Sequence, residues 1–128
     1  MKKKKLPAYC PCGSQLDYKD CCGRFHDDEA VPPDALSLMK SRYSAFVKKR
    51  ADYLLSTWHE TTRPKELALD DNIKWLGLEI VSFDDGEQEA FVEFIARGKI
   101  SGRAFKQVEK SRFVKEGGRW FYVDGDVK

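Results

Sequence analysis

The spacing of hydrophobic residues changes once along the chain, near residue 73. From Asp34 onward apolar residues recur at three- and four-residue steps, which predicts a helix with Asp34 as its N-cap. A second, short helix is expected to start at Asp52 and to end before Pro64, because a residue that precedes proline disfavours helical backbone. The apolar positions of the two helices are Leu36, Met39, Tyr43, Phe46, Val47, Tyr53, Leu54, Leu55 and Trp58.

Beyond residue 73 apolar and polar residues alternate, which is typical of half-buried strands. Short glycine-containing loops between alternating segments are hairpin signals, so the strands should form an antiparallel meander. The pattern predicts an α+β fold in which the helices cover one face of a curved four-stranded sheet. The expected strands are 74–83, 87–97, 104–115 and 119–124, joined by Asp84-Asp85-Gly86, a loop containing Gly98 and Gly102, and Glu116-Gly117-Gly118.

Three segments follow from this pattern and from the turn residues. Residues 1–27 are rich in turn residues and contain every cysteine, and residues 28–33 form a connector. The connector ends in Pro32-Pro33, which favours an extended backbone. Residues 34–128 are expected to form a separate α+β domain.

Charge is dense but balanced, with 23 Lys+Arg against 21 Asp+Glu. A dedicated nucleic-acid-binding domain is usually more basic than this. The run Lys2–Lys5 could attract RNA, a ribosome or an anionic lipid surface, or it could be a solubilising tail. No apolar run follows it as in a signal peptide, and none approaches the roughly 20 residues of a membrane helix. We therefore expect a soluble, cytoplasmic protein.

All four cysteines lie in the segment CPCGSQLDYKDCC, so disulfides between distant segments are not expected and a metal site is. Zinc favours a tetrahedron of thiolates, here supplied by Cys10, Cys12, Cys21 and Cys22. His26 is an alternative fourth ligand in place of Cys22, and spacing does not decide between them. Four protein ligands leave no open position, so this zinc is expected to be structural, not catalytic.

The strand at 104–115 places polar residues among aromatic ones. Gln107 and Glu109 share a face with Phe105 and Phe113, and hairpin pairing could bring Glu93 close to Gln107. A carboxylate in such surroundings could act as a general acid or base, which makes Glu93 and Glu109 candidate catalytic residues. The alternative, which we favour, is that both glutamates lie on a solvated face or pair with Arg97, Arg103 or Arg112.

A second group of candidates follows the short helix. His59 could act as a base and Arg63 could hold an anionic ligand, although both also suit a helix C-terminus. The chain has no phosphate-binding loop, no dinucleotide glycine motif and no metal-binding histidine pair, which argues against an energy-coupled or redox enzyme. The candidate ligand pocket comprises Tyr43, Trp58, His59, Arg63, Trp75, Gln107 and Glu109, of which the aromatic residues also suit a small core.

The cysteine spacing, C-x-C followed after eight residues by C-C, resembles the SEC-C motif found at the end of the SecA translocation ATPase. The resemblance implies that Cys10, Cys12, Cys21 and Cys22 are the zinc ligands and that His26 is a neighbour. Gln15 stands where the motif usually has glycine, a departure that removes no ligand.

The remainder of the chain resembles the YchJ-like family of uncharacterised bacterial proteins. The matching segments are SRYSAFV at 41–47, DYLLSTWHETTRP at 52–64 and SRFVKEGGRWFYVDG at 111–125. This resemblance implies a SEC-C zinc knuckle followed by a nuclear transport factor two-like (cystatin-like) domain, a cone of helices on a curved antiparallel sheet. It does not imply an activity.

Three hypotheses about function follow. The leading one is a binding or adaptor protein whose knuckle docks on a protein or ribonucleoprotein partner, as the resemblance to the SecA knuckle implies through its contacts with the SecB chaperone and lipid. The alternative is a small-molecule-binding or enzymatic domain with a pocket between sheet and helices. In the third, the knuckle only helps the chain to fold.

Overall fold

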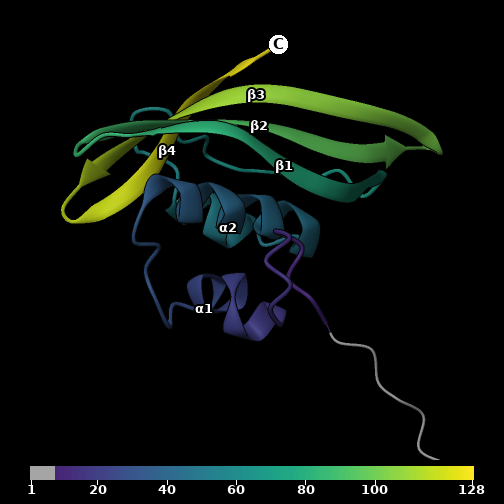
Figure 1. Ribbon diagram of the computed structural model, residues 1–128, viewed down its shortest axis with the longest axis horizontal. Helices are drawn as coiled ribbons and strands as arrows, with labels where there is room; N and C mark the ends of the chain where they lie inside the picture. Colours follow the sequence, from purple (N-terminus) through teal and green to yellow (C-terminus); the bar gives the residue numbers. More distant parts are fainter. Residues whose placement is uncertain (1–7) are drawn as a thin grey trace, which may run out of the picture.

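A computed structural model describes residues 8–128, and the Lys2–Lys5 run lies outside the described residues. The elements form successive layers: a curved sheet, helix α2 (Ala35–Lys48) beneath it, and the cysteine-bearing segment with α1 (Cys22–His26) beneath α2 (Figure 1). The predicted α+β fold is confirmed. None of the helices in this part of the chain has the length and apolar character of a membrane span.

The sheet is the antiparallel meander that the alternating pattern predicted, in the order β1-β2-β3-β4. Two-residue loops join its last three strands, at Ser101-Gly102 and Gly117-Gly118, and all four residues have positive φ, as a type I′ turn requires. Gly98, expected in a loop, lies instead inside a strand. The strands are β1 (Ile73–Asp85), β2 (Glu89–Ile100), β3 (Arg103–Glu116) and β4 (Arg119–Val127).

Helix α2 begins where the sequence predicted it. The carboxylate of Asp34 accepts a hydrogen bond of 2.7 Å from the backbone N–H of Ser37, which satisfies one free donor of the first turn. The helix ends with Lys49 in the left-handed conformation at φ 58°. One long face of α2 lies under the sheet, so this helix determines where the core and any cavity lie.

The second helix, α3 (Ala51–Ser56), is shorter than predicted. The hydroxyl of Thr57 donates to the carbonyl of Tyr53 at 2.8 Å and closes the helix. The chain then pairs with β4, where the N–H of His59 donates to the carbonyl of Tyr122 at 2.7 Å. Trp58 therefore lies in a β-bridge and not on a helix, because pairing with the sheet replaces the helical hydrogen bonds.

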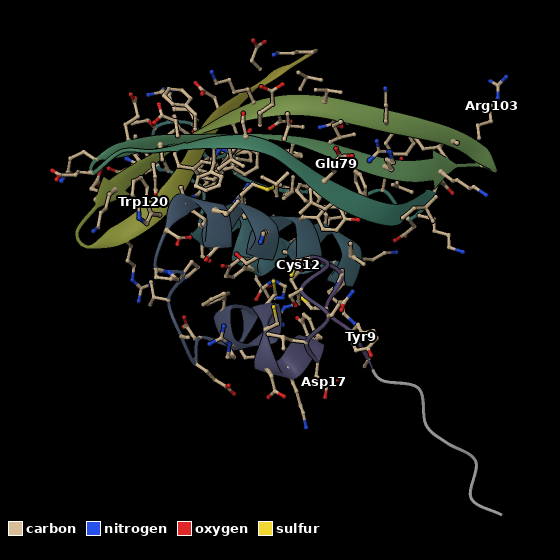
Figure 2. The ribbon with its side chains drawn as sticks, viewed as in Figure 1. Tyr9, Cys12, Asp17, Glu79, Arg103 and Trp120 are labelled. Carbon is tan, nitrogen blue, oxygen red and sulfur yellow. The ribbon has the colours of Figure 1, made fainter. Side chains whose placement is uncertain are left out.

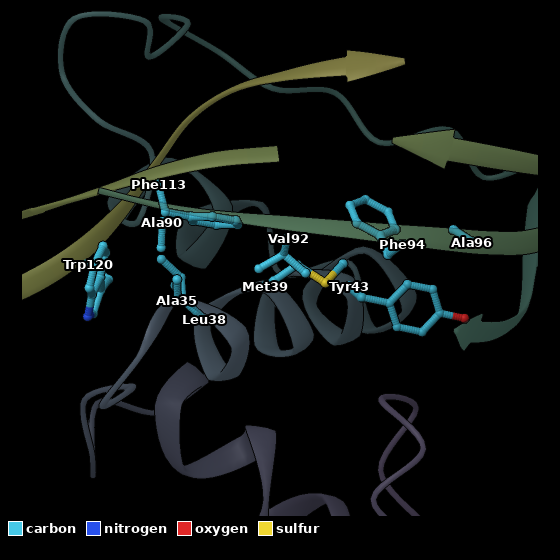
Figure 3. Close-up of a cluster of buried hydrophobic side chains, with 10 residues drawn as sticks. All are labelled: Ala35, Leu38, Met39, Tyr43, Ala90, Val92, Phe94, Ala96, Phe113 and Trp120. Carbon is cyan, nitrogen blue, oxygen red and sulfur yellow. The ribbon is translucent and has the colours of Figure 1, made fainter. Parts of the chain in front are cut away.

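The main core lies between α2 and the inner face of the sheet (Figure 3). Alternate residues of β2 point inward, as the period of two requires. The opposite face of α2 carries the small residues Ser41, Ser44 and Ala45, each with no exposed surface. The core residues are Ala35, Leu38, Met39, Tyr43, Ala90, Val92, Phe94, Ala96, Phe113 and Trp120.

The cysteine-bearing segment packs on this second face of α2. A β-bridge between Tyr9 and Asp17 closes its first loop, and a 3-10 turn (Tyr18–Asp20) leads into α1. Phe25 of α1 is buried in a small cluster that includes Ala45 and residues of α3. The segment, called the knuckle below (residues 8–27), thus shares buried surface with the helical layer.

Candidate metal centre and cavity

The structure brings the four cysteines of the knuckle together. Their Sγ atoms all lie within 4.8 Å of one another, and those of Cys12 and Cys21 are 3.6 Å apart. Cys10, Cys12 and Cys22 are buried and Cys21 is partly exposed. The sulfurs gather between α1 and α2 (Figure 2). Four thiols at these separations, on a short closed loop, can coordinate a single metal ion.

A tight backbone turn produces this clustering. The N–H of Cys10 donates to the carbonyl of Leu16 at 2.7 Å, which folds the loop back on itself. The hydroxyl of Ser14 donates to the sulfur of Cys21 at 3.1 Å. Gln15, which replaces the glycine of the motif, has φ 65°, a region where glycine is favoured. The substitution therefore leaves the turn intact at a cost of about 1 kcal/mol.

The buried thiols of the cluster shift one another's pKa. Hydrogen bonds from Cys12 and Cys22 lower the pKa of the Cys10 thiol, and the same contact with Cys10 raises the pKa of the Cys22 thiol. A bound divalent cation would stabilise all four as thiolates, since coordination deprotonates a thiol.

A serine of α2 contacts the cluster directly. The Oγ atom of Ser44 lies 3.4 Å from the sulfur of Cys10, and both groups are buried. The hydroxyl can therefore donate to a thiolate at this position. Sequence reasoning missed Ser44, although Ser41, Ser44 and Ala45 form a stripe of small residues that indicates a second packing face on the helix.

His26, the alternative fourth ligand, has both ring nitrogens occupied. Its Nε2–H donates to the carbonyl of Ser41 at 2.8 Å, and its Nδ1 accepts from the hydroxyl of Tyr18. Burial lowers the pKa of His26, which favours this neutral form. The ring also packs against Tyr53 at 4.6 Å between centroids. His26 therefore fastens the knuckle to α2 and leaves Cys22 as the fourth potential ligand.

A cavity of about 540 Å³ lies between α2, the inner face of the sheet and residues 67–73. Five of the seven predicted pocket residues line it: Tyr43, Trp58, Trp75, Gln107 and Glu109.

His59 and Arg63 do not line this cavity. The ring nitrogens of His59 bond to Thr61 and Glu116, each at 2.8 Å. The guanidinium of Arg63 donates to the carbonyl of Trp58 at 2.8 Å. Both side chains thus fix the chain that follows α3.

Glu93 lies on the opposite face of the sheet from the cavity. It pairs with Lys110, whereas Gln107 pairs with Ala96, so the expected proximity of Glu93 and Gln107 is wrong. The reason is the strand period, because a shift by one residue moves a side chain to the other face. Its carboxylate accepts from the Nζ of Lys128 at 3.4 Å. The structure therefore does not bring the three catalytic candidates together.

Glu109 is only 9% exposed, and within residues 8–128 it forms no ion pair with an arginine, so both forms of the favoured alternative are wrong for this residue. Its carboxylate accepts from the amide of Gln107 at 3.0 Å and from the hydroxyl of Ser111 at 2.6 Å. All three residues point inward from β3 and line the cavity.

Arg42 is a buried charged residue of the cavity that sequence reasoning missed. It is 6% exposed, and its Nη1 donates to the carbonyl of Leu54 at 2.8 Å and to the hydroxyl of Thr57 at 2.7 Å. Its guanidinium lies over the ring of Tyr122, 4.4 Å from the centroid. Burial lowers the pKa of Arg42 to about 10, so the group stays charged at neutral pH. Arg42 follows the inward-facing Met39 by three residues and so shares its face of the helix, which is the sequence signal that could have indicated its burial.

Comparison with known proteins gives matches for both parts of the chain. Residues 34–125 match the family described as "YchJ, middle NTF2-like domain", and residues 10–24 match the SEC-C motif. A UPF0225 protein of Bordetella pertussis is 53% identical, with 99% of this chain and 98% of the relative covered. One from Chromobacterium violaceum is 47% identical, with 98% and 97% covered.

Two solved structures share the architecture. The solution structure of a SEC-C motif containing protein from Rhodopseudomonas palustris has a TM-score of 0.83 at 30% identity, with 92% of this chain and 97% of that chain covered. The crystal structure of a SEC-C motif containing protein from Psychrobacter arcticus has a TM-score of 0.78 at 28% identity, with 91% and 80% covered.

Proposed function

The chain belongs to the YchJ family of SEC-C proteins, and from that premise we propose that it binds one structural zinc ion and serves as a binding module for a protein or ribonucleoprotein partner. The observation that carries the proposal is the cluster of four cysteine sulfurs within 4.8 Å of one another.

The geometry of the sulfurs supports zinc. A Zn–S bond of about 2.3 Å places sulfurs roughly 3.8 Å apart in a regular tetrahedron. The separation of 3.6 Å between Cys12 and Cys21 is close to this value. Thiolates are soft ligands that select zinc over the hard divalent cations. With four protein ligands the ion has no position for water or substrate, so its role is to hold the knuckle in shape on α2.

The outer surface of the knuckle supports docking. Tyr9 and Leu16 are 59% and 54% exposed, and the loop that carries them is closed by a β-bridge and by the cysteines (Figure 2 labels Tyr9). An aromatic and an aliphatic side chain on a rigid loop can act as anchors in a partner's pocket. The Lys2–Lys5 run precedes this loop in the sequence and would add attraction to an anionic partner.

Metal analysis and native mass spectrometry of the full chain test the zinc site. We expect one zinc ion per chain in the wild type and its loss in Cys12→Ser. A chain purified without zinc that neither takes up the ion nor gains thermal stability when zinc is added would contradict the proposal.

Affinity purification with chemical cross-linking tests docking. We expect Tyr9→Ser/Leu16→Ser to lose specific partners while it keeps its zinc and its melting temperature. The matched control is Leu76→Ser/Val81→Ser on β1, where the side chains are 53% and 49% exposed. If both double variants retain the same partners as the wild type, docking through the knuckle is wrong and the metal serves folding alone.

A further inference from the structure

The cavity under the sheet has a polar and an apolar part. Arg42 from α2 and Glu109 from β3 provide its buried charged groups, and a third charged residue, Asp70, lines it on an exposed segment. Trp75 packs edge-to-face against Phe105 and Tyr43, with centroids 5.7 Å and 5.9 Å apart, and these rings form an aromatic wall. A volume of about 540 Å³ is within the range of small-molecule sites, roughly 300–1,000 Å³.

The guanidinium of Arg42 is incompletely paired. Within residues 8–128 it has no carboxylate oxygen within 4.0 Å, and Nη1 makes both of its hydrogen bonds. Nε and Nη2 thus remain as donors on a side chain that lines the cavity. A buried charge without an ionic partner is costly, which favours a ligand that supplies an anionic acceptor.

Glu109 presents the opposite charge to the same cavity. Each of its oxygens accepts one hydrogen bond from a neutral donor, and each has a second acceptor position. The charge of Glu109 raises the pKa of Arg42 and so offsets part of the lowering that burial causes. The two groups therefore interact, although they do not form an ion pair. A ligand with a single negative charge would be repelled by Glu109, and one with a single positive charge would be repelled by Arg42.

We propose that this cavity binds a small zwitterion with an apolar side chain, the chemistry of an aromatic or aliphatic α-amino acid. Its carboxylate would accept from Arg42, its ammonium would donate to Glu109, and its side chain would lie against Trp75 and Phe105. Such a ligand would provide an oppositely charged partner for Arg42 and for Glu109 and would fill the apolar part of the cavity. Ala68 and Asp70, which line the cavity from a segment without helix or strand, are exposed, so the cavity reaches the surface there.

Three probes applied to the full-length zinc-loaded chain test the assignment. L-Phenylalanine carries both charges, 3-phenylpropionate lacks the ammonium, and 2-phenylethylamine lacks the carboxylate. Binding is measured by calorimetry and by the fluorescence of Trp58 and Trp75, which line the cavity. We expect L-phenylalanine to bind and each analogue to bind at least about tenfold more weakly. Equal binding of either analogue, or no binding of any probe at millimolar concentration, would overturn the proposal.

Two variants test which residue binds each charged group of the ligand. Arg42→Gln should remove the preference for the carboxylate, so that L-phenylalanine and 2-phenylethylamine bind alike. Glu109→Gln should remove the preference for the ammonium in the same way. Glu116→Gln is the matched control, because this exposed carboxylate bonds to His59 outside the cavity, and it should bind like the wild type. Variants that fold, as judged by circular dichroism, and still prefer L-phenylalanine over the analogues as the wild type does would refute these roles. The probe series on the wild type tests the site even if a variant does not fold.

Discussion

Replacing Gly125 by alanine should disrupt the polar centre of the cavity. A Cβ atom at this position would lie 2.2 Å from Oε2 of Glu109 and 2.6 Å from its Cδ. Non-bonded heavy atoms normally stay about 3.5 Å apart, so the carboxylate would have to move by roughly 1 Å. The cavity gives the carboxylate room to shift, but hydrogen bonds from Gln107 and Ser111 hold it in its present position.

The displacement has a calculable cost. It would strain or break the bonds that Glu109 accepts from Gln107 and Ser111, and bonds to a charged group contribute about 1.5–3 kcal/mol each. We therefore expect Gly125→Ala to reduce the free energy of unfolding by about 2–4 kcal/mol. For a chain of 128 residues the melting temperature should fall by roughly 10 °C.

Urea denaturation of the zinc-loaded protein, followed by circular dichroism, measures this loss. Gly77→Ala is the matched control, since a Cβ atom there meets nothing within 4 Å. Its stability should change by less than about 1 kcal/mol. Truncating the obstructing side chain removes the clash, so Gly125→Ala should cost at least about 1 kcal/mol less in a Glu109→Ala background. Additive free energies in this cycle would refute the reasoning.

Three further outcomes are expected. Ser44→Ala removes the hydroxyl beside the sulfur of Cys10 and should lower the stability of the zinc-loaded protein by about 0.5–1.5 kcal/mol in urea denaturation, with the zinc retained. Burial raises the pKa of Tyr122 to about 12 from 10.0. The stability that this shift contributes is therefore fully present below pH 10.0 and is lost as the pH rises to about 12. Ultraviolet absorbance titration should show one late-ionising tyrosine fewer in Tyr122→Phe. His59→Ala removes only partly exposed bonds, including that to Glu116, and should change thermal stability by less than about 1 kcal/mol and leave phenylalanine binding unchanged in calorimetry.

The sheet could be predicted from the sequence because its signals are local. Alternation identifies each strand, and glycine in a short loop identifies each hairpin, without knowledge of distant residues. The cysteines could be placed for the same reason, since all four lie in one short segment. Side chains on β3 were also assigned to the correct shared face, because a face depends only on parity within one strand.

Relations between strands were predicted less well. Glu93 was expected near Gln107, but pairing across the hairpin depends on where the loop closes. The loop closes at Ser101-Gly102, a shorter loop than the expected one containing both Gly98 and Gly102. The end of α3 was also misplaced, because the competing partner of that backbone, Tyr122, lies more than sixty residues further along the chain. Neither partner is visible in the local pattern.

Arg42 shows the same limit at the level of a single side chain. Hydropathy assigns an arginine to the exposed face of a helix, and in most helices that assignment is right. Here the helix has no exposed long face, because the sheet covers one side and the knuckle covers the other. Ser41 and Ser44 are small enough for the knuckle to approach, and Arg42, between them in sequence, is turned beneath the sheet. The knuckle thus contacts α2 at Ser41 and Ser44, whereas Arg42 of the same helix lines the cavity, so one helix connects the two candidate sites.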